Sequence, residues 1–126
     1  EKFLKFRRLN VNYYRTYLKF NSNIKILKPK KLTESSFWKL PVMLKSKKLR
    51  DSLLKYLISQ NIFADKSYYP LLHFQPALKK RSKNKYSNLK DSEKISDKHL
   101  LLPCHQSLKK QDIKTICDKI NKFFNL

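Results

Sequence analysis

The residues with the most evident binding chemistry lie at positions 68–76, in the sequence YYPLLHFQP. This stretch has no charged residue, although the chain carries a formal net charge of +21. Its two prolines fix the backbone φ angle and lack an N–H donor, which favours an ordered loop. Such a loop can hold a polar ligand with the groups of Tyr69, His73 and Gln75. A partly buried structural role for His73 is the other interpretation.

Cysteine and histidine side chains offer two further kinds of site. His99, Cys104, His105 and Cys117 are ligand types that zinc prefers, but they lack the paired spacing of known zinc sites. Cys104 and His105 could form a nucleophile and base, yet neighbours in an extended segment point to opposite faces. Cys117 falls on the apolar stripe of a predicted helix and is interpreted as a core residue. We therefore expect no metal site and no catalytic residue here.

Composition excludes several classes of protein. The chain has no glycine, so it cannot form a glycine-rich phosphate-binding loop of the Walker or dinucleotide type. At 126 residues it has room for one domain, and its 40% hydrophobic content argues against disorder. No apolar run approaches the length needed to span a bilayer, and two cysteines do not indicate a disulfide scaffold. We expect a soluble, cytoplasmic protein without membrane association.

The net charge allows two interpretations. Thirty lysines and arginines against nine acids are typical of a nucleic-acid-binding module, with the dense cluster at positions 78–85 as its surface. The other interpretation is a lysine-rich composition without a binding role, which the spread of lysines over the whole length favours. Non-specific binding to polyanions is expected in either case.

The hydrophobic pattern predicts an α+β fold, with a small antiparallel sheet of three or four strands packed on helices. Strands are predicted at 24–26, 37–44, 62–63 and 100–102, and helices at 2–20, 47–60, 92–97 and from an N-cap at Ser107 to 124. Pro41 cannot donate to a ladder, which predicts an edge position or a bulge. Asp112 is expected in the first turn of the last helix, where the helix dipole favours a negative charge.

Taken in order, six motifs resemble one known family. They are RRLN at 7–10, FWKLPV at 37–42, LRD at 49–51, NI at 61–62, YPLLHFQP at 69–76 and LLPCH at 101–105. This set resembles the C-terminal third of the DegT/DnrJ/StrS-type sugar aminotransferases, which use pyridoxal phosphate. Asn61 stands where that family usually has a glycine, and asparagine is the next-best residue for a left-handed backbone.

The resemblance implies a division of the chain and a role for the loop. Residues 1–22 would be a helix linking from a large cofactor domain, and residues 23–126 would be the small C-terminal domain. His73, Tyr69 and Gln75 would bind a nucleotide-linked keto-sugar, and an amino acid would donate the amino group. The parent enzyme would be a homodimer.

The resemblance also implies what this chain lacks. The Schiff-base lysine and the other cofactor-binding motifs of the family belong to the large domain, and no stretch of this sequence matches them. We therefore expect the chain alone to bind no cofactor and to be inactive in transamination. Because it begins at Glu1 rather than Met, we expect a C-terminal piece of a longer protein. A remnant without a function of its own is the remaining alternative.

Overall fold

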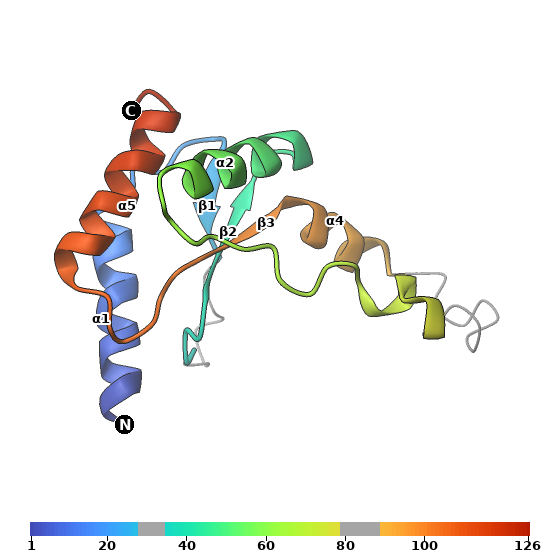
Figure 1. The fold of residues 1–126 in the computed structure, drawn as a ribbon, viewed down its shortest axis with the longest axis horizontal. Helices are drawn as coiled ribbons and strands as arrows, with labels where there is room; N and C mark the ends of the chain where they lie inside the picture. The colour runs from blue at the N-terminus through green and yellow to red at the C-terminus, as the bar shows by residue number, and fades with distance from the viewer. Residues whose placement is uncertain (28–34, 79–88) are drawn as a thin grey trace.

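The computed structural model describes residues 1–27, 35–78 and 89–126 (Figure 1). A small antiparallel sheet is surrounded by helices, which confirms the predicted α+β class. The elements are α1 (Lys2–Tyr17), β1 (Ile24–Ile26), β2 (Leu40–Leu44), α2 (Lys47–Ser59), the 3-10 turn η1 (Leu72–Phe74), α4 (Lys90–Lys98), β3 (His99–Leu102) and α5 (Lys110–Phe123).

The sheet has the order β1-β2-β3, with β2 in the centre and both pairs antiparallel. Val42 is opposite Ile26 on one side and Leu100 on the other. Leu40, Val42 and Leu44 alternate with less buried residues along β2, as expected when one face of a sheet covers a core. The predicted strand from 37 thus begins three residues later, at Leu40.

Pro41 lies in the central strand, so the predicted edge or bulge position is wrong. The backbone explains why proline is tolerated there. Its carbonyl accepts a hydrogen bond from the Leu27 N–H at 3.2 Å, just beyond the last residue of β1. In an antiparallel ladder the N and O of one residue point to the same side. The missing donor therefore faces the end of β1, where the ladder stops.

The strand predicted at 62–63 does not form. The Ile62 N–H donates to the Leu57 carbonyl at 2.9 Å, and the Asn61 N–H donates to Ile58 at 3.0 Å. These two bonds form a Schellman motif that ends α2, with Asn61 in the left-handed conformation (φ 58°). Asn61 thus adopts the left-handed backbone expected of it, without a glycine. A few residues later, Asp65 forms an isolated antiparallel bridge with Leu101.

The last helix ends in the same way. The Leu126 N–H donates to the Asn121 carbonyl at 3.0 Å, the Asn125 N–H donates to Lys122 at 3.1 Å, and Asn125 has a φ of 56°. At its other end, the N-cap is Lys109 rather than the predicted Ser107. Asp112 lies in the first turn as expected, and its carboxylate accepts a hydrogen bond from the Lys109 N–H at 2.8 Å.

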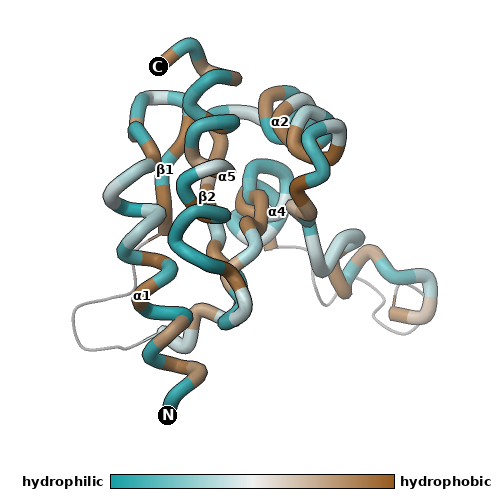
Figure 2. Tube along the Cα trace, turned by 60° about the vertical axis from the view of Figure 1, so that its left-hand side comes forward, coloured by the Kyte–Doolittle hydropathy of each residue, from teal (hydrophilic) through white to brown (hydrophobic). Residues whose placement is uncertain are grey.

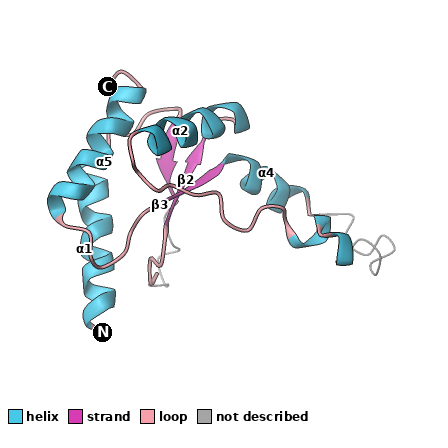
Figure 3. Cartoon of the chain, in the orientation of Figure 1, coloured by secondary structure: helices cyan, strands magenta, loops and turns pink. Residues whose placement is uncertain are grey.

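Helices α1 and α5 lie side by side, while α2 packs on the sheet and on α5 (Figures 1 and 3). They share one hydrophobic core with the sheet, to which Val11, Tyr14, Leu53, Ile113 and Cys117 contribute. Figure 2 shows hydrophilic and hydrophobic residues alternating along the helices, as expected of helices with one buried face. The burial of Cys117 confirms its predicted core position.

Helix α1 is shorter than predicted. It ends at Tyr17, after which Leu18 is extended. Val11, Tyr14 and the polar Asn10 are buried, whereas Phe6 and Leu9 are exposed. The Asn10 amide donates to the His105 carbonyl at 2.9 Å, which satisfies a polar group inside the core. Whether the chain divides at residue 22 stays a prediction.

A second buried asparagine joins α5 to α1. The Asn121 side chain donates to the Tyr17 carbonyl and accepts from the Lys19 N–H, both at 2.9 Å. These bonds satisfy the backbone where α1 ends, since the last carbonyls of a helix have no partner within it. Among the described helices, none combines the length and the apolar run needed to cross a membrane.

Candidate functional site

A cavity of about 690 Å³ lies between the loop of residues 68–75 and the start of α4. We call it the loop cavity. Its lining comes from both segments: Tyr68, Tyr69, Pro70, Leu71, Leu72, His73, Gln75, Leu89 and Ser92. The loop of residues 68–75 lies beside α4, on the side of the molecule away from α1 and α5 (Figure 3). All three residues predicted to bind a ligand therefore line one cavity.

Backbone and side-chain bonds hold this loop in shape. The 3-10 turn is closed by the Phe74 N–H to the Leu71 carbonyl at 2.9 Å, and by Gln75 to Leu72 at 3.0 Å. The Gln75 amide also donates to the Pro70 carbonyl at 3.2 Å. Gln75 thus has a role within the loop itself, in addition to its place in the cavity wall. The Lys66 ammonium lies 5.1 Å from the ring centre of Tyr69.

His73 contacts a residue that the sequence did not single out. Its Nε2 lies 3.0 Å from Oε1 of Glu93, on α4. The His73 side chain is only 10% exposed, against 40% for Glu93, and its ring lies 4.1 Å from that of Phe74. The nearest signal in the sequence was the predicted helix at 92–97, which did not indicate which of its residues would face the loop.

The Glu93 contact limits what His73 can do. A carboxylate only accepts hydrogen bonds, so Nε2 must carry the proton in this contact. Nδ1 is then the remaining polar atom of the ring. In a neutral ring it accepts a hydrogen bond, and in the imidazolium it donates one. Donation from Nδ1 to an anionic oxygen therefore requires the protonated ring.

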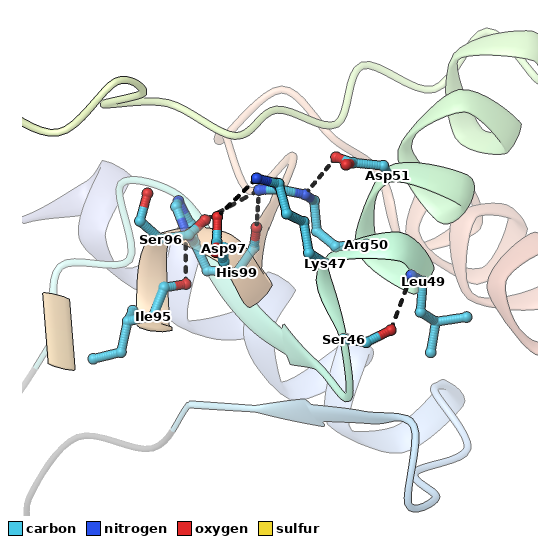
Figure 4. Close-up of polar contacts among 9 residues, drawn as sticks. All are labelled: Ser46, Lys47, Leu49, Arg50, Asp51, Ile95, Ser96, Asp97 and His99. Carbon is cyan, nitrogen blue, oxygen red and sulfur yellow. Dashed lines mark hydrogen bonds and ion pairs between the residues drawn. The ribbon is translucent and has the colours of Figure 1, made fainter. Parts of the chain in front are cut away.

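The far end of α4 is fastened to α2 (Figure 4). Arg50 is fully buried, and its Nη1 donates to the carbonyl of Ser96 at 3.1 Å and of His99 at 3.4 Å. Its Nε donates to Asp51 at 2.7 Å. The Arg50 cation thus satisfies carbonyls at the C-terminal end of α4, where the helix dipole also favours positive charge.

Within the described part of the chain, two polar atoms at this junction have no hydrogen-bond partner. They are Nη2 of Arg50 and Oγ of Ser96, and both are buried. An unpaired buried donor costs about 1–3 kcal/mol of free energy, and more when it belongs to a charged group. The hydrogen bonds of Nη1 and Nε offset this cost, and the net contribution of Arg50 is smaller than its bonds suggest.

A second cavity, of about 480 Å³, lies where residues 63–65 meet the end of β3, with Trp38 and His105 also in its wall. Lys39 donates there to Asp65 at 2.5 Å and to Ser67 at 2.6 Å, and the Ser67 hydroxyl also donates to Asp65. Burial alone would raise the pKa of the Asp65 carboxyl, but the bonds from Lys39 and Ser67 outweigh it and lower the pKa.

The cysteines are buried thiols. Burial raises the pKa of Cys104 to about 11 and that of Cys117 to about 12. The Cys104 thiol donates to the Arg7 carbonyl at 3.7 Å, whereas His105 is exposed, in line with the expected opposite orientations. Among the described residues, no group of three or more His, Cys, Asp or Glu side chains could hold a metal ion.

The described lysines do not fit a pyridoxal phosphate site. A Schiff-base lysine needs a desolvated amine or a neighbouring cation. None of the lysines in the described ranges is buried, and Lys39, one of the few that are partly covered, is paired with a carboxylate. No reaction step is therefore assigned to a cofactor on this chain. Most of the basic cluster at 78–85 lies outside the described residues.

Three comparisons agree on what the chain resembles. Residues 1–121 match the DegT/DnrJ/EryC1/StrS aminotransferase family. The chain is 32% identical over 119 residues to dTDP-4-amino-4,6-dideoxy-D-glucose transaminase of Shigella dysenteriae, and the match covers 91% of this chain and 32% of that protein. Its fold is similar to that of the aminotransferase TlmJ from Streptoalloteichus hindustanus, with a TM-score of 0.84 and 22% identity over 98% of this chain and 32% of TlmJ. It is also similar to the PLP form of the putative sugar aminotransferase Spr1654 from Streptococcus pneumoniae, with a TM-score of 0.80 and 20% identity over 96% of this chain and 31% of Spr1654.

Proposed function

This chain belongs to the DegT/DnrJ/EryC1/StrS aminotransferase family, and from that membership we propose that it is the C-terminal small domain of a pyridoxal-phosphate-dependent sugar aminotransferase. It spans 32% of the length of the curated relative and 32% of TlmJ. In this proposal residues 1–22 link to a large domain that holds the cofactor, residues 23–126 form the small domain, and the complete enzyme is a homodimer.

The role of the chain is to shape the pocket for a nucleotide-linked keto-sugar, which receives an amino group from an amino acid such as glutamate. One observation carries this proposal: Tyr69, His73 and Gln75 line the same loop cavity. The His73 imidazolium donates from Nδ1 to a phosphate oxygen, and the Tyr69 phenol contacts the sugar. The two free, buried thiols suit the reducing cytoplasm that the proposal includes.

A chimera tests this function. The matching third of the Shigella dysenteriae transaminase is replaced by this chain, and cofactor absorbance verifies that the large domain is intact. We expect transaminase activity, and a loss of roughly tenfold to a hundredfold in kcat/KM for His73→Ala, as a lost charge-assisted hydrogen bond implies. His105→Ala is the matched control, because it removes an exposed imidazole outside the loop cavity.

Two results would contradict the proposal. One is a chimera that binds pyridoxal phosphate but has no activity, and the other is a His73→Ala chimera as active as the parent. Tight RNA binding by the 126-residue chain at physiological salt would instead favour the nucleic-acid-binding alternative, since non-specific binding weakens steeply as salt rises.

A further inference from the structure

The contact between His73 and Glu93 assigns a role to a residue outside the predicted site. We propose that Glu93 is a positioning residue, whose carboxylate holds Nε2–H of His73 so that the ring presents Nδ1 to a ligand in the loop cavity. The identity of the ligand rests on the proposed function. The contact itself does not, because both residues belong to this chain.

Geometry confines the His73 ring on several sides. Nε2 is 3.0 Å from the Glu93 carboxylate, the Phe74 ring packs against it at 4.1 Å, and the side chain is largely covered. The backbone around it is held in the 3-10 turn by the Phe74 and Gln75 N–H groups. A largely covered ring with one nitrogen engaged and a phenyl ring packed against it has little freedom to turn, so its second nitrogen points in a defined direction.

Helix α4 can hold Glu93 in place because its other end is fixed. Glu93 begins the helical bonding by donating from its N–H to the Leu89 carbonyl at 3.0 Å. The main-chain carbonyl of Ser96, three residues later, accepts a hydrogen bond from the buried Arg50. The helix therefore braces the loop against α2, with Glu93 at the contact.

This arrangement makes the ligand chemistry of His73 depend on protonation. With Nε2–H committed to Glu93, a neutral ring offers Nδ1 as an acceptor for a sugar hydroxyl. A protonated ring offers Nδ1–H to a phosphate. Glu93 is the charged group on α4 that faces the ring, and the phenols of Tyr68 and Tyr69 are the other titratable groups in the described cavity wall.

The test uses the full 126-residue chain and needs no ligand. Imidazole ¹⁵N NMR reports which nitrogen of His73 carries the proton, and amide hydrogen exchange of Phe74 and Gln75 reports how firmly the loop is held. For Glu93→Ala we expect ¹⁵N shifts that move toward the average of two exchanging tautomers, and amide exchange about fivefold to tenfold faster. Glu93→Gln keeps an acceptor and should retain Nε2–H and most of the protection.

Asp91→Asn is the matched control. Asp91 lies in the same first turn of α4 and carries the same charge, but its side chain is 95% exposed and pairs with Lys94 instead. The proposal is overturned if Glu93→Ala leaves both readouts unchanged, or if Asp91→Asn alters them as strongly. An inactive chimera with an intact Nε2–H signal would contradict the proposed function alone.

Discussion

Arg50 and Ser96 are 46 positions apart in the sequence, yet Nη1 of the buried Arg50 guanidinium donates to the Ser96 carbonyl at 3.1 Å. The bond joins the first turns of α2 to the last turn of α4. It shows that the helix beside the loop cavity is positioned from the protein core.

Replacing Arg50 should destabilise the fold by an amount that depends on the substitute. Arg50→Ala removes the cation and leaves a void, and we expect a loss of about 3–5 kcal/mol. Arg50→Met fills the space without an unpaired donor, so its free energy of unfolding should fall clearly less than that of Arg50→Ala. Urea unfolding measures both. Lys47→Ala is the control, because the exposed Lys47–Asp97 pair contributes at most about 1 kcal/mol. Equal losses for Met and Ala would show that the hydrogen bonds dominate.

Asn121→Ala should loosen the junction between α1 and α5. The substitution leaves the Tyr17 carbonyl and the Lys19 N–H without their partner, which costs about 1–3 kcal/mol when such groups are buried. Thermal unfolding gives the measurement. Asn12→Ala, at an exposed position of α1, should change stability by no more than about 0.5 kcal/mol. Similar shifts for the two variants would contradict the role given to Asn121.

Asn61→Gly and Asn61→Ala should act in opposite directions. Asn61 has a φ of 58°, which glycine adopts freely and alanine adopts at a cost of about 1 kcal/mol. Chemical unfolding should therefore rank Gly at or above Asn, and Ala below it. Asn125, with the same backbone conformation, serves as a second site. If the alanine variants at both positions were as stable as the parent, a left-handed backbone would not be needed at these helix ends.

The two thiols should stay protonated and unreactive in the folded chain. Burial raises their pKa values to about 11 and 12, so the folded state holds these protons where the unfolded chain releases them. Stability from this source is complete below about pH 9, the ordinary thiol range, and is lost as pH rises through the two folded values. Urea unfolding at a series of pH values measures the loss.

A thiol-specific disulfide reagent at pH 8 provides the direct check. The folded chain should react only as fast as it unfolds, and the chain in urea should react at once. Ser107→Cys adds a thiol at an exposed position and should react immediately in the folded protein. Rapid modification of Cys104 or Cys117 in the folded parent would contradict their burial.

The periodicity of apolar residues predicted the elements whose apolar residues are buried. It failed where backbone hydrogen bonding determined the structure. Ile62 and Phe63 have the composition of a strand, but Ile62 uses its N–H to end α2, and Phe63 is 90% exposed. Pro41 is in the central strand because β1 is short, and the length of a partner strand is not visible at the proline itself.

The candidate site was predictable in part for a similar reason. Tyr69, His73 and Gln75 are close in sequence, so one ordered loop brings them together. Glu93 is 20 positions from His73, and the contact depends on the rotation of α4 about its axis. Arg50 and the packing of α4 on α2 fix that rotation. These contacts join residues far apart in the sequence, so no local sequence pattern predicts them.

The exposed Phe3, Phe6 and Leu9 on α1 have a consequence for handling the purified chain. Exposed apolar side chains on a helix favour aggregation, whereas a net charge of +21 keeps the molecules apart by electrostatic repulsion. Salt at 0.1 M shortens the reach of that repulsion to about 10 Å. The purified chain should therefore stay soluble in a buffer of low ionic strength and become turbid as salt is added, the reverse of ordinary salting-in.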